Sequence, residues 1–234
     1  MQSAIKHYLD RTGHDSFTPK LALFDMDGVL YNSMPHHAKA WNKAMEEYGL
    51  TMTEEDAFAM EGMRGVETIQ QIATKQWGKL LSEEECMEIY NRKTEVYNQF
   101  PVAELIPGIK ELQQELINRG IKIGVVTGSG QPALINRIFN DFDGLVSRDI
   151  VVTALDVKRG KPAPDPYLQG MEKGHCLPSE TMVIENAPLG VKAAVAAGCL
   201  TIAVNTGPLN DSILYEAGAD IVFPNMASLS SALQ

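Results

Sequence analysis

The fold is decided by residues 21–30, which read Leu21-Ala22-Leu23-Phe24-Asp25-Met26-Asp27-Gly28-Val29-Leu30. A short, continuously apolar run is typical of a strand buried on both faces of a parallel sheet, so we expect a strand over 21–25. Gly28 permits a tight turn that exposes the two aspartates at the end of that strand. The plainer interpretation is an ordinary Asp-Gly turn without chemistry. Only residues further along the chain distinguish the two.

Beyond residue 100 the chain alternates between short apolar runs and helical patterns. This rhythm predicts an α/β fold, a doubly wound parallel sheet with helices on both faces. We expect further strands over 121–127, 150–154, 182–185, 200–204 and 220–223. The intervening helices are expected over 109–119, 131–140, 164–173, 189–197 and 209–217.

The first strand breaks this rhythm, because no second strand follows it for about 90 residues. Four helical patterns stand there instead, over 35–48, 53–60, 64–77 and 82–99, separated by glycines and a proline. A helical insertion directly after the first strand predicts a small cap domain. We therefore expect an N-terminal extension over 1–19, a catalytic core over 20–33 and 104–234, and a helical cap over 34–103.

Composition excludes several classes of protein. The net charge is −10, and we find no basic stripe of the kind that tracks a nucleic-acid backbone. No run of about 18 apolar residues predicts a membrane span, and the N-terminus lacks the apolar centre of a signal peptide. Three scattered cysteines fit free thiols in a reducing compartment. We expect a cytoplasmic protein, a monomer, with neither a nucleic-acid nor a membrane partner.

Polar side chains follow the first four of the expected strands at their carboxyl ends. Since parallel strands present their carboxyl ends at one edge of the sheet, these side chains should converge. The first strand contributes Asp25 and Asp27, and the second contributes Thr127-Gly128-Ser129. A later loop contributes Lys161, and the fourth strand ends on Glu185-Asn186. Together they would form the wall of a site for a metal and a phosphate.

Each residue type has a chemical reason to be there. A carboxylate can attack phosphorus, so Asp25 can act as a covalent nucleophile. A second carboxylate, Asp27, can protonate the leaving oxygen and then deprotonate water. Mg²⁺ prefers hard oxygen ligands and would screen the repulsion between an anionic nucleophile and an anionic substrate. Thr127 and Lys161 would stabilise the transferring phosphoryl group.

The motifs DMDGVL, TGS, GKPAPDPY and ENAPLG, in this order over roughly 20–225, resemble the haloacid dehalogenase-like superfamily. The resemblance is to the branch that includes β-phosphoglucomutase and related sugar phosphatases and pyrophosphatases. It implies a Rossmann-like core, Mg²⁺ as cofactor, Asp25 as nucleophile and Asp27 as general acid and base. It also implies phosphoryl binding by Thr127 and Lys161. The presence of Asp27 argues against dehalogenation, because dehalogenases proper lack the second aspartate.

The resemblance also implies a metal shell, and the residues around it suggest a substrate-binding set. The metal ligands would be Asp25, Asp27 through its carbonyl, Glu185 and Asn186. The substrate-binding residues would be Gly128, Ser129, Asn32, Glu61, Arg64 and His37. His37 matches the position of a histidine that aids proton transfer to the second aspartate. A pair of surface histidines at a helix start is the alternative interpretation.

Two departures from the family pattern bear on the substrate. Asn186 stands where many relatives have a second acid, so the site loses one negative charge. In the cap, Glu61 and Gly65 replace a lysine and an arginine that hold the second phosphate in β-phosphoglucomutase, and Arg64 is one position away. Glu61 could join the Mg²⁺ shell, or it could be a solvated carboxylate at a helix end.

A cap carboxylate on the metal would leave little room for an organic leaving group. Among small phosphorylated substrates, the sequence therefore favours inorganic pyrophosphate, and the protein would be an inorganic pyrophosphatase. The alternatives are a β-phosphoglucomutase or sugar-phosphate phosphatase and, more distantly, a non-catalytic binding module.

Overall fold

The computed structural model describes residues 1–233; Gln234, the last residue of the expected core, lies outside them. Its centre is a parallel six-stranded sheet with the order β3-β2-β1-β4-β5-β6, which confirms the predicted α/β class. The strands are β1 Leu21–Phe24, β2 Lys122–Val126, β3 Val151–Val152, β4 Thr181–Glu185, β5 Leu200–Val204 and β6 Ile221–Phe223. The strand order reverses between β1 and β4. A crevice opens at such a point in sheets of this kind.

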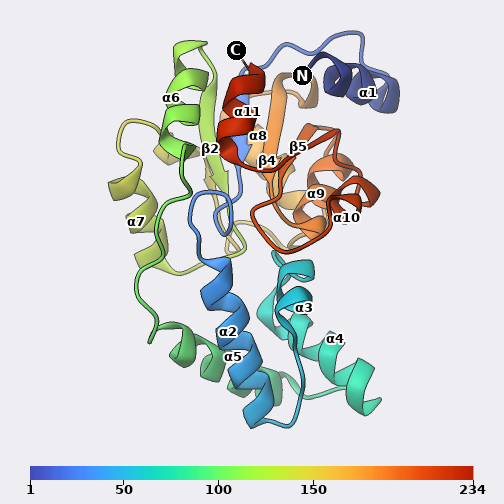
Figure 1. Cartoon of the computed structure of the whole chain (residues 1–234), viewed down its shortest axis with the longest axis vertical. Helices are drawn as coiled ribbons and strands as arrows, with labels where there is room; N and C mark the ends of the chain where they lie inside the picture. Colours follow the sequence, from blue (N-terminus) through green and yellow to red (C-terminus); the bar gives the residue numbers. More distant parts are fainter. Residues whose placement is uncertain (234) are drawn as a thin grey trace.

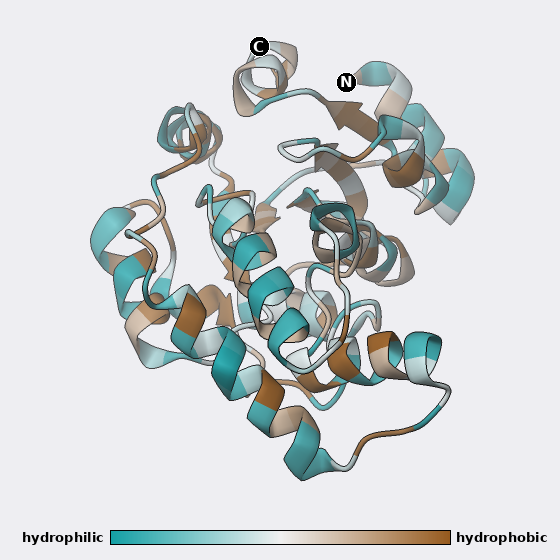
Figure 2. Ribbon diagram, turned by 60° about the horizontal axis from the view of Figure 1, so that its bottom comes forward, coloured by the Kyte–Doolittle hydropathy of each residue, from teal (hydrophilic) through white to brown (hydrophobic). Residues whose placement is uncertain are grey.

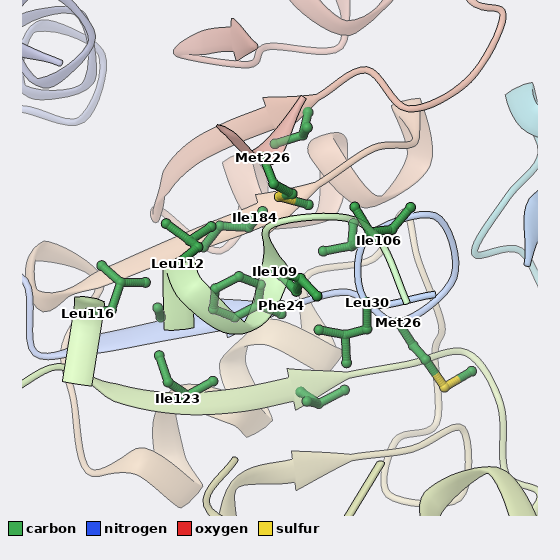
Figure 3. Packing of buried hydrophobic residues seen from close by; sticks show 14 of the residues in the cluster. Phe24, Met26, Leu30, Ile106, Ile109, Leu112, Leu116, Ile123, Ile184 and Met226 are labelled. Atoms are coloured by element: carbon green, nitrogen blue, oxygen red, sulfur yellow. The ribbon is translucent and has the colours of Figure 1, made fainter. Parts of the chain in front are cut away.

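The two faces of β1 bury different residues, as the alternation of side chains along a strand requires. Ala22 and Phe24 point into a core with α6 (Ile109–Asn118) and α11 (Met226–Leu233). Figure 3 shows Phe24 in this cluster with Ile109 and Leu112. Leu21 and Leu23 point into the opposite core, with α8 (Asp165–Gly174) and α9 (Pro188–Ala196). Burial on both faces explains the continuous apolar sequence of the strand.

The remaining core helices are short. They are α7 Pro132–Asp141, α10 Asp211–Glu216 and the 3₁₀ helices η1 Arg148–Ile150 and η2 Pro178–Glu180. In Figure 2 the strands are brown, whereas the surface helices alternate between teal and brown bands. Among the described residues, no helix is both long and apolar enough to cross a membrane.

The insertion after β1 forms a group of four helices at the lower end of Figure 1. They are α2 Met34–Glu47, α3 Glu54–Ala59, α4 Gly65–Trp77 and α5 Glu83–Tyr97. Capping boxes begin α3 at Thr53 and α5 at Ser82, so each helix starts on satisfied backbone N–H groups. The helices share an apolar cluster of their own, separate from the sheet clusters. Leu209 of the core joins this cluster and packs the cap against the core.

The N-terminal segment packs at the end of the core remote from the cap (Figure 1). It contains α1 (Gln2–Thr12), which Gly13 ends in a left-handed conformation. The Arg11 guanidinium pairs with the buried Asp220 at 2.9 Å, and Asp220 also accepts from the Thr201 amide. The segment is therefore fastened to β5.

Candidate active site

The nucleophile candidate Asp25 stands directly after β1, at the crevice between β1 and β4. Its amide donates to the Ile184 carbonyl at 3.1 Å, which continues the pairing with β4. Gly28 closes the turn with a φ of 79°, a conformation that favours glycine. A Cβ on Gly28 would stand 2.1 Å from the Asn186 side chain, so the turn also makes room for Asn186.

Lys161 joins two carboxylates beneath the crevice. Its Nζ donates to Asp25 Oδ1 and, at 2.6 Å, to Glu185 Oε1. Lys161 is 3% exposed and Glu185 is fully buried. Burial raises the pKa of Asp25 to about 7, although the charge of Lys161 opposes the shift. Burial would lower the pKa of Lys161, but Asp25 and Glu185 together raise it above its ordinary value. Lys161 is therefore a permanent cation that holds the nucleophile in place.

Glu185 has donors on both of its oxygens. Its Oε1 accepts from Lys161 and from the Tyr167 hydroxyl at 2.7 Å. Its Oε2 accepts from the amides of Asn186 and Ala187 at 2.9 and 3.1 Å. The expected role as a direct metal ligand does not fit this arrangement, because a cation would have to replace these protein donors. The side chain orients Lys161 instead.

Asp27 is linked to the cap through a chain of polar groups. Its Oδ1 accepts from Ser33 Oγ at 2.5 Å and lies 3.3 Å from His37 Nε2. His37 Nδ1 is in turn 2.8 Å from Lys93 Nζ. A charged lysine can only donate, so His37 accepts at Nδ1 and carries its proton on Nε2, toward Asp27. Burial would raise the pKa of Asp27, but His37, Ser33 and Lys93 hold it below its ordinary value.

Lys93 was not recognised in the sequence. It is 7% exposed and lies between the rings of Trp41 and Tyr97, with its Nζ 5.1 and 5.2 Å from their centres. Burial lowers its pKa to about 8. The sequence did carry a signal, because Lys93 occupies one position of the buried stripe Cys86, Ile89, Lys93 and Val96 on α5. The contact of Tyr167 with Glu185 likewise emerged only with the three-dimensional arrangement.

Asn186 and the cap residue Glu61 meet on the other side of Asp25. Asn186 Nδ2 donates to Glu61 Oε2 at 2.8 Å. The remaining oxygens, Asn186 Oδ1 and Glu61 Oε1, are buried and find no hydrogen-bond partner within residues 1–233. Burial, together with Asp25 and Glu185, raises the pKa of Glu61 well above its ordinary value. Glu61 is therefore a buried carboxyl group in contact with Asn186, not a solvated helix-end carboxylate.

These oxygens fit Mg²⁺, which takes carboxylate, amide and carbonyl oxygens. The donors would be Asp25, the Asp27 carbonyl, Asn186 and Glu61. No group of three His, Cys, Asp or Glu side chains with metal-binding geometry occurs in the described part of the chain. A metal here therefore depends on the amide and carbonyl oxygens as well as the carboxylates.

A cavity of about 120 Å³ lies between the core and the cap. The expected residues Asp25, Asp27, His37, Glu61, Gly128 and Ser129 line it, together with Trp41, Tyr90, Lys93 and Tyr97. Thr127 is buried beside it, and its Oγ1 accepts from the Ser129 amide at 3.0 Å, which shapes the loop.

Two residues expected to bind substrate lie outside the lining of this cavity. The Asn32 side chain is exposed at the junction of core and cap, and its amide donates to the Glu104 carbonyl at 2.8 Å. The Arg64 guanidinium donates to the carbonyls of Val157 and Lys158 on the core. Neither therefore contacts the space where a substrate would lie in this conformation.

Comparison with known proteins agrees with this geometry. The model of the family described as haloacid dehalogenase-like hydrolase matches residues 22–204. This chain belongs to that family. Hexitol phosphatase A of Escherichia coli (strain K12) is 35% identical over 214 residues, which cover 91% of this chain and 94% of that protein. β-Phosphoglucomutase of Bacillus subtilis (strain 168) is 26% identical over 92% of this chain and 93% of that protein.

Solved structures show the same relationship. A β-phosphoglucomutase-like protein from Bacteroides vulgatus is 45% identical and superposes with a TM-score of 0.93, covering 98% of this chain and 93% of its own. The chain is therefore an enzyme of the phosphatase and phosphomutase class. Neither curated relative reported above is named for pyrophosphate. The comparisons thus do not support the pyrophosphatase that Glu61 suggested and agree better with the sugar-phosphate alternative.

Proposed function

We propose that this protein is a Mg²⁺-dependent phosphohydrolase that forms a phosphoryl-enzyme at Asp25. The supporting observation is the pairing of Asp25 with Lys161 beneath the crevice, while Asp27 is tied to His37 above it. The Asp25 carboxylate attacks phosphorus as the bond to the leaving oxygen breaks, and Asp27 gives that oxygen a proton. Asp27 receives this proton from Lys93 through His37. Asp27 then takes a proton from the water that attacks the acyl phosphate. Mg²⁺, when bound, would neutralise charge on the phosphoryl oxygens.

Hydrolysis is favoured over phosphoryl return to a second hydroxyl. A phosphomutase that works through a bisphosphate must hold a second phosphate in the cap. At the corresponding loop this chain has the carboxylate of Glu61 and the side-chain-free Gly65, and Arg64 is engaged by core carbonyls. A second dianion would find no free cation in this loop of the described chain, so release to water is the expected outcome.

Phosphorylated sugars or polyols are the first candidate substrates. The cavity beyond Asp27 is bounded by the rings of Trp41, Tyr90 and Tyr97 with Lys93 between them. Aromatic walls with one buried cation suit an organic leaving group that carries hydroxyls. The names of the hexitol phosphatase and β-phosphoglucomutase relatives agree with this chemistry.

Pyrophosphate is the second candidate, and the contact between Glu61 and Asn186 favours it. A cap carboxylate that shares the metal would shorten the space above the phosphoryl group and add the charge that Asn186 lacks. Both candidates use the same nucleophile and the same acid. The two candidates differ in what determines selectivity. For sugar or polyol phosphates it would be the cavity beyond Asp27, and for pyrophosphate it would be the carboxylate of Glu61.

A substrate screen with purified protein and Mg²⁺ separates the two candidates. Higher kcat/KM for hexose or hexitol phosphates than for pyrophosphate supports the first, and the reverse order supports the second. Glu61→Gln should lower pyrophosphate hydrolysis more than tenfold if Glu61 reaches the metal, whereas the exposed neighbour Glu67→Gln makes the same charge change and should not. Asp25→Asn should abolish turnover of every substrate. Unchanged turnover would refute the phosphoryl-enzyme, and a ligand-binding function that survives this change would indicate a binding module.

A further inference from the structure

Arg64 makes a polar bridge from the cap to the core that the proposed chemistry does not use. It immediately precedes α4, where its carbonyl accepts from the Thr68 amide at 3.0 Å, so its backbone is held. Its Nη2 donates to the Val157 carbonyl at 3.3 Å and to the Lys158 carbonyl. Hydrogen bonds from a charged donor are among the stronger ones in proteins.

The core loop that receives Arg64 is itself held in place. Asp156 Oδ2 accepts from the Thr153 amide at 2.8 Å and from its hydroxyl at 2.6 Å. Asp156 Oδ1 pairs with Lys173 on α8 at 2.8 Å. The carbonyls of the next two residues are thus presented from a fixed support. Lys161, which holds the nucleophile, follows them in the same loop.

The cap loop that carries Arg64 also carries Glu61 and packs on Lys161. Between them Gly62 adopts a φ of 83°, and a Cβ there would stand 2.9 Å from Lys161 Cδ. The void lined by Gly62, Arg64, Thr127 and Lys161 measures only about 10 Å³, roughly the space of one water molecule. No phosphate fits between Arg64 and Lys161. Arg64 therefore contacts protein in this closed arrangement, not substrate.

We propose that Arg64 is a positioning residue that latches the cap loop 60–64 onto the core loop 153–161. The latch seats Glu61 against Asn186 and packs Gly62 on Lys161 in the same movement, so closure completes both the metal side and the phosphoryl side of the site. The effect on turnover rests on the proposed function, whereas the effect on cap position does not. When the two hydrogen bonds break, the cap loop loses its polar attachment to loop 153–161.

Three variants test the latch. Arg64→Ala removes both hydrogen bonds, and Arg64→Lys keeps the charge but not the fork of donors. Arg92→Ala is the matched control, because Arg92 is a cap arginine that pairs with Glu47 and Glu95 inside the cap. Small-angle scattering of the protein without substrate should show a larger radius of gyration for Arg64→Ala, an intermediate value for Arg64→Lys and the wild-type value for Arg92→Ala.

Activity measurements then test positioning. Arg64→Ala should lower kcat/KM by about tenfold to a hundredfold, the range expected for losing hydrogen bonds from a charged donor. In a protein that already carries Glu61→Gln, Arg64→Ala should lower kcat/KM by a much smaller factor, since both substitutions disturb the same contact of cap loop 60–64 with the core. Equal radii in all variants would overturn the latch whatever the activity shows. A changed radius with fully additive effects would overturn the positioning role, and a changed radius in a protein inactive on all phosphates would refute the proposed function alone.

Discussion

Glu185→Gln is the change that most sharply separates two roles for one buried side chain. The carboxylate accepts from Lys161 and Tyr167 on one oxygen and from two amides on the other. A glutamine must point its NH₂ group at one of these pairs of donors. Removing one partner of a buried ion pair typically costs about 3–5 kcal/mol of unfolding free energy. Asp25 still holds Lys161, so we expect a loss near the lower end of this range.

The effect on catalysis follows from the displacement of Lys161. Loss of one well-placed group that stabilises transition-state charge typically lowers kcat by about 10²–10³. We expect Glu185→Gln to fall in this range at saturating Mg²⁺. Tyr167→Phe removes only one hydroxyl donor from the same oxygen and should lower kcat by about tenfold or less. Both variants should leave the Mg²⁺ concentration for half-maximal activity close to the wild-type value.

The assay is a Mg²⁺ titration of steady-state hydrolysis, with urea unfolding of the same preparations. Asn186→Ala is the comparison, because Asn186 Oδ1 is buried without a partner in the described chain and would be a metal ligand in the proposed site. Asn186→Ala should raise the Mg²⁺ requirement at least tenfold. If Glu185→Gln raises the requirement equally and recovers wild-type kcat at high Mg²⁺, Glu185 is a metal ligand and the present reasoning is wrong.

Three further predictions address other parts of the molecule. Lys93 is charged below and neutral above its pKa of about 8, so the kcat of the wild-type protein should fall as the pH rises through 8. Lys93→Met should lower kcat and remove this fall from the pH profile. A fall that persists in the variant would contradict a role of the charged Lys93 in turnover. Asp220→Ala should lower the urea-derived unfolding free energy by about 3 kcal/mol with kcat unchanged, since it leaves Arg11 without its carboxylate partner and the buried Thr201 amide without an acceptor; a loss below about 1 kcal/mol would contradict this. Gly62→Ala should lower kcat by about tenfold to a hundredfold through displacement of Lys161, and unchanged turnover would show that the loop adapts.

The sequence was sufficient for the sheet and the edge at which the site lies. Apolar runs marked six strands, and polar residues at their carboxyl ends had to meet because all strands are parallel. Boundaries shifted by one or a few residues, most at β3, where 150–154 was expected and only Val151–Val152 forms a strand, paired with β2 alone. The final helix α11 was missed, because its apolar residues Met226 and Leu229 alternate with serines and alanines.

The sequence could not predict that Glu185 contacts Lys161 whereas Asn186 contacts Glu61. Glu185 and Asn186 are adjacent, and successive side chains at the end of a strand point to opposite sides. Which one faces Lys161 depends on the register of β4 against β1, which no local pattern records. Lys93 could not be predicted for a similar reason. In the sequence it only interrupts an apolar helix stripe, and its contact with His37 arises because α2 packs against α5.

The closed cap explains why one nucleophile is compatible with two candidate substrates. Glu61, which accepts a hydrogen bond from Asn186, lies on one side of the cavity, and Lys93 with its aromatic neighbours forms the side beyond Asp27. The leaving oxygen would lie beside Asp27 in either case, because Asp27 supplies its proton in the proposed reaction. What differs is the group attached to that oxygen. A sugar would use the aromatic walls, whereas a phosphate would leave them in contact with a hydrated dianion. Burying charge against apolar rings is costly, so the aromatic walls favour the organic leaving group over a phosphate.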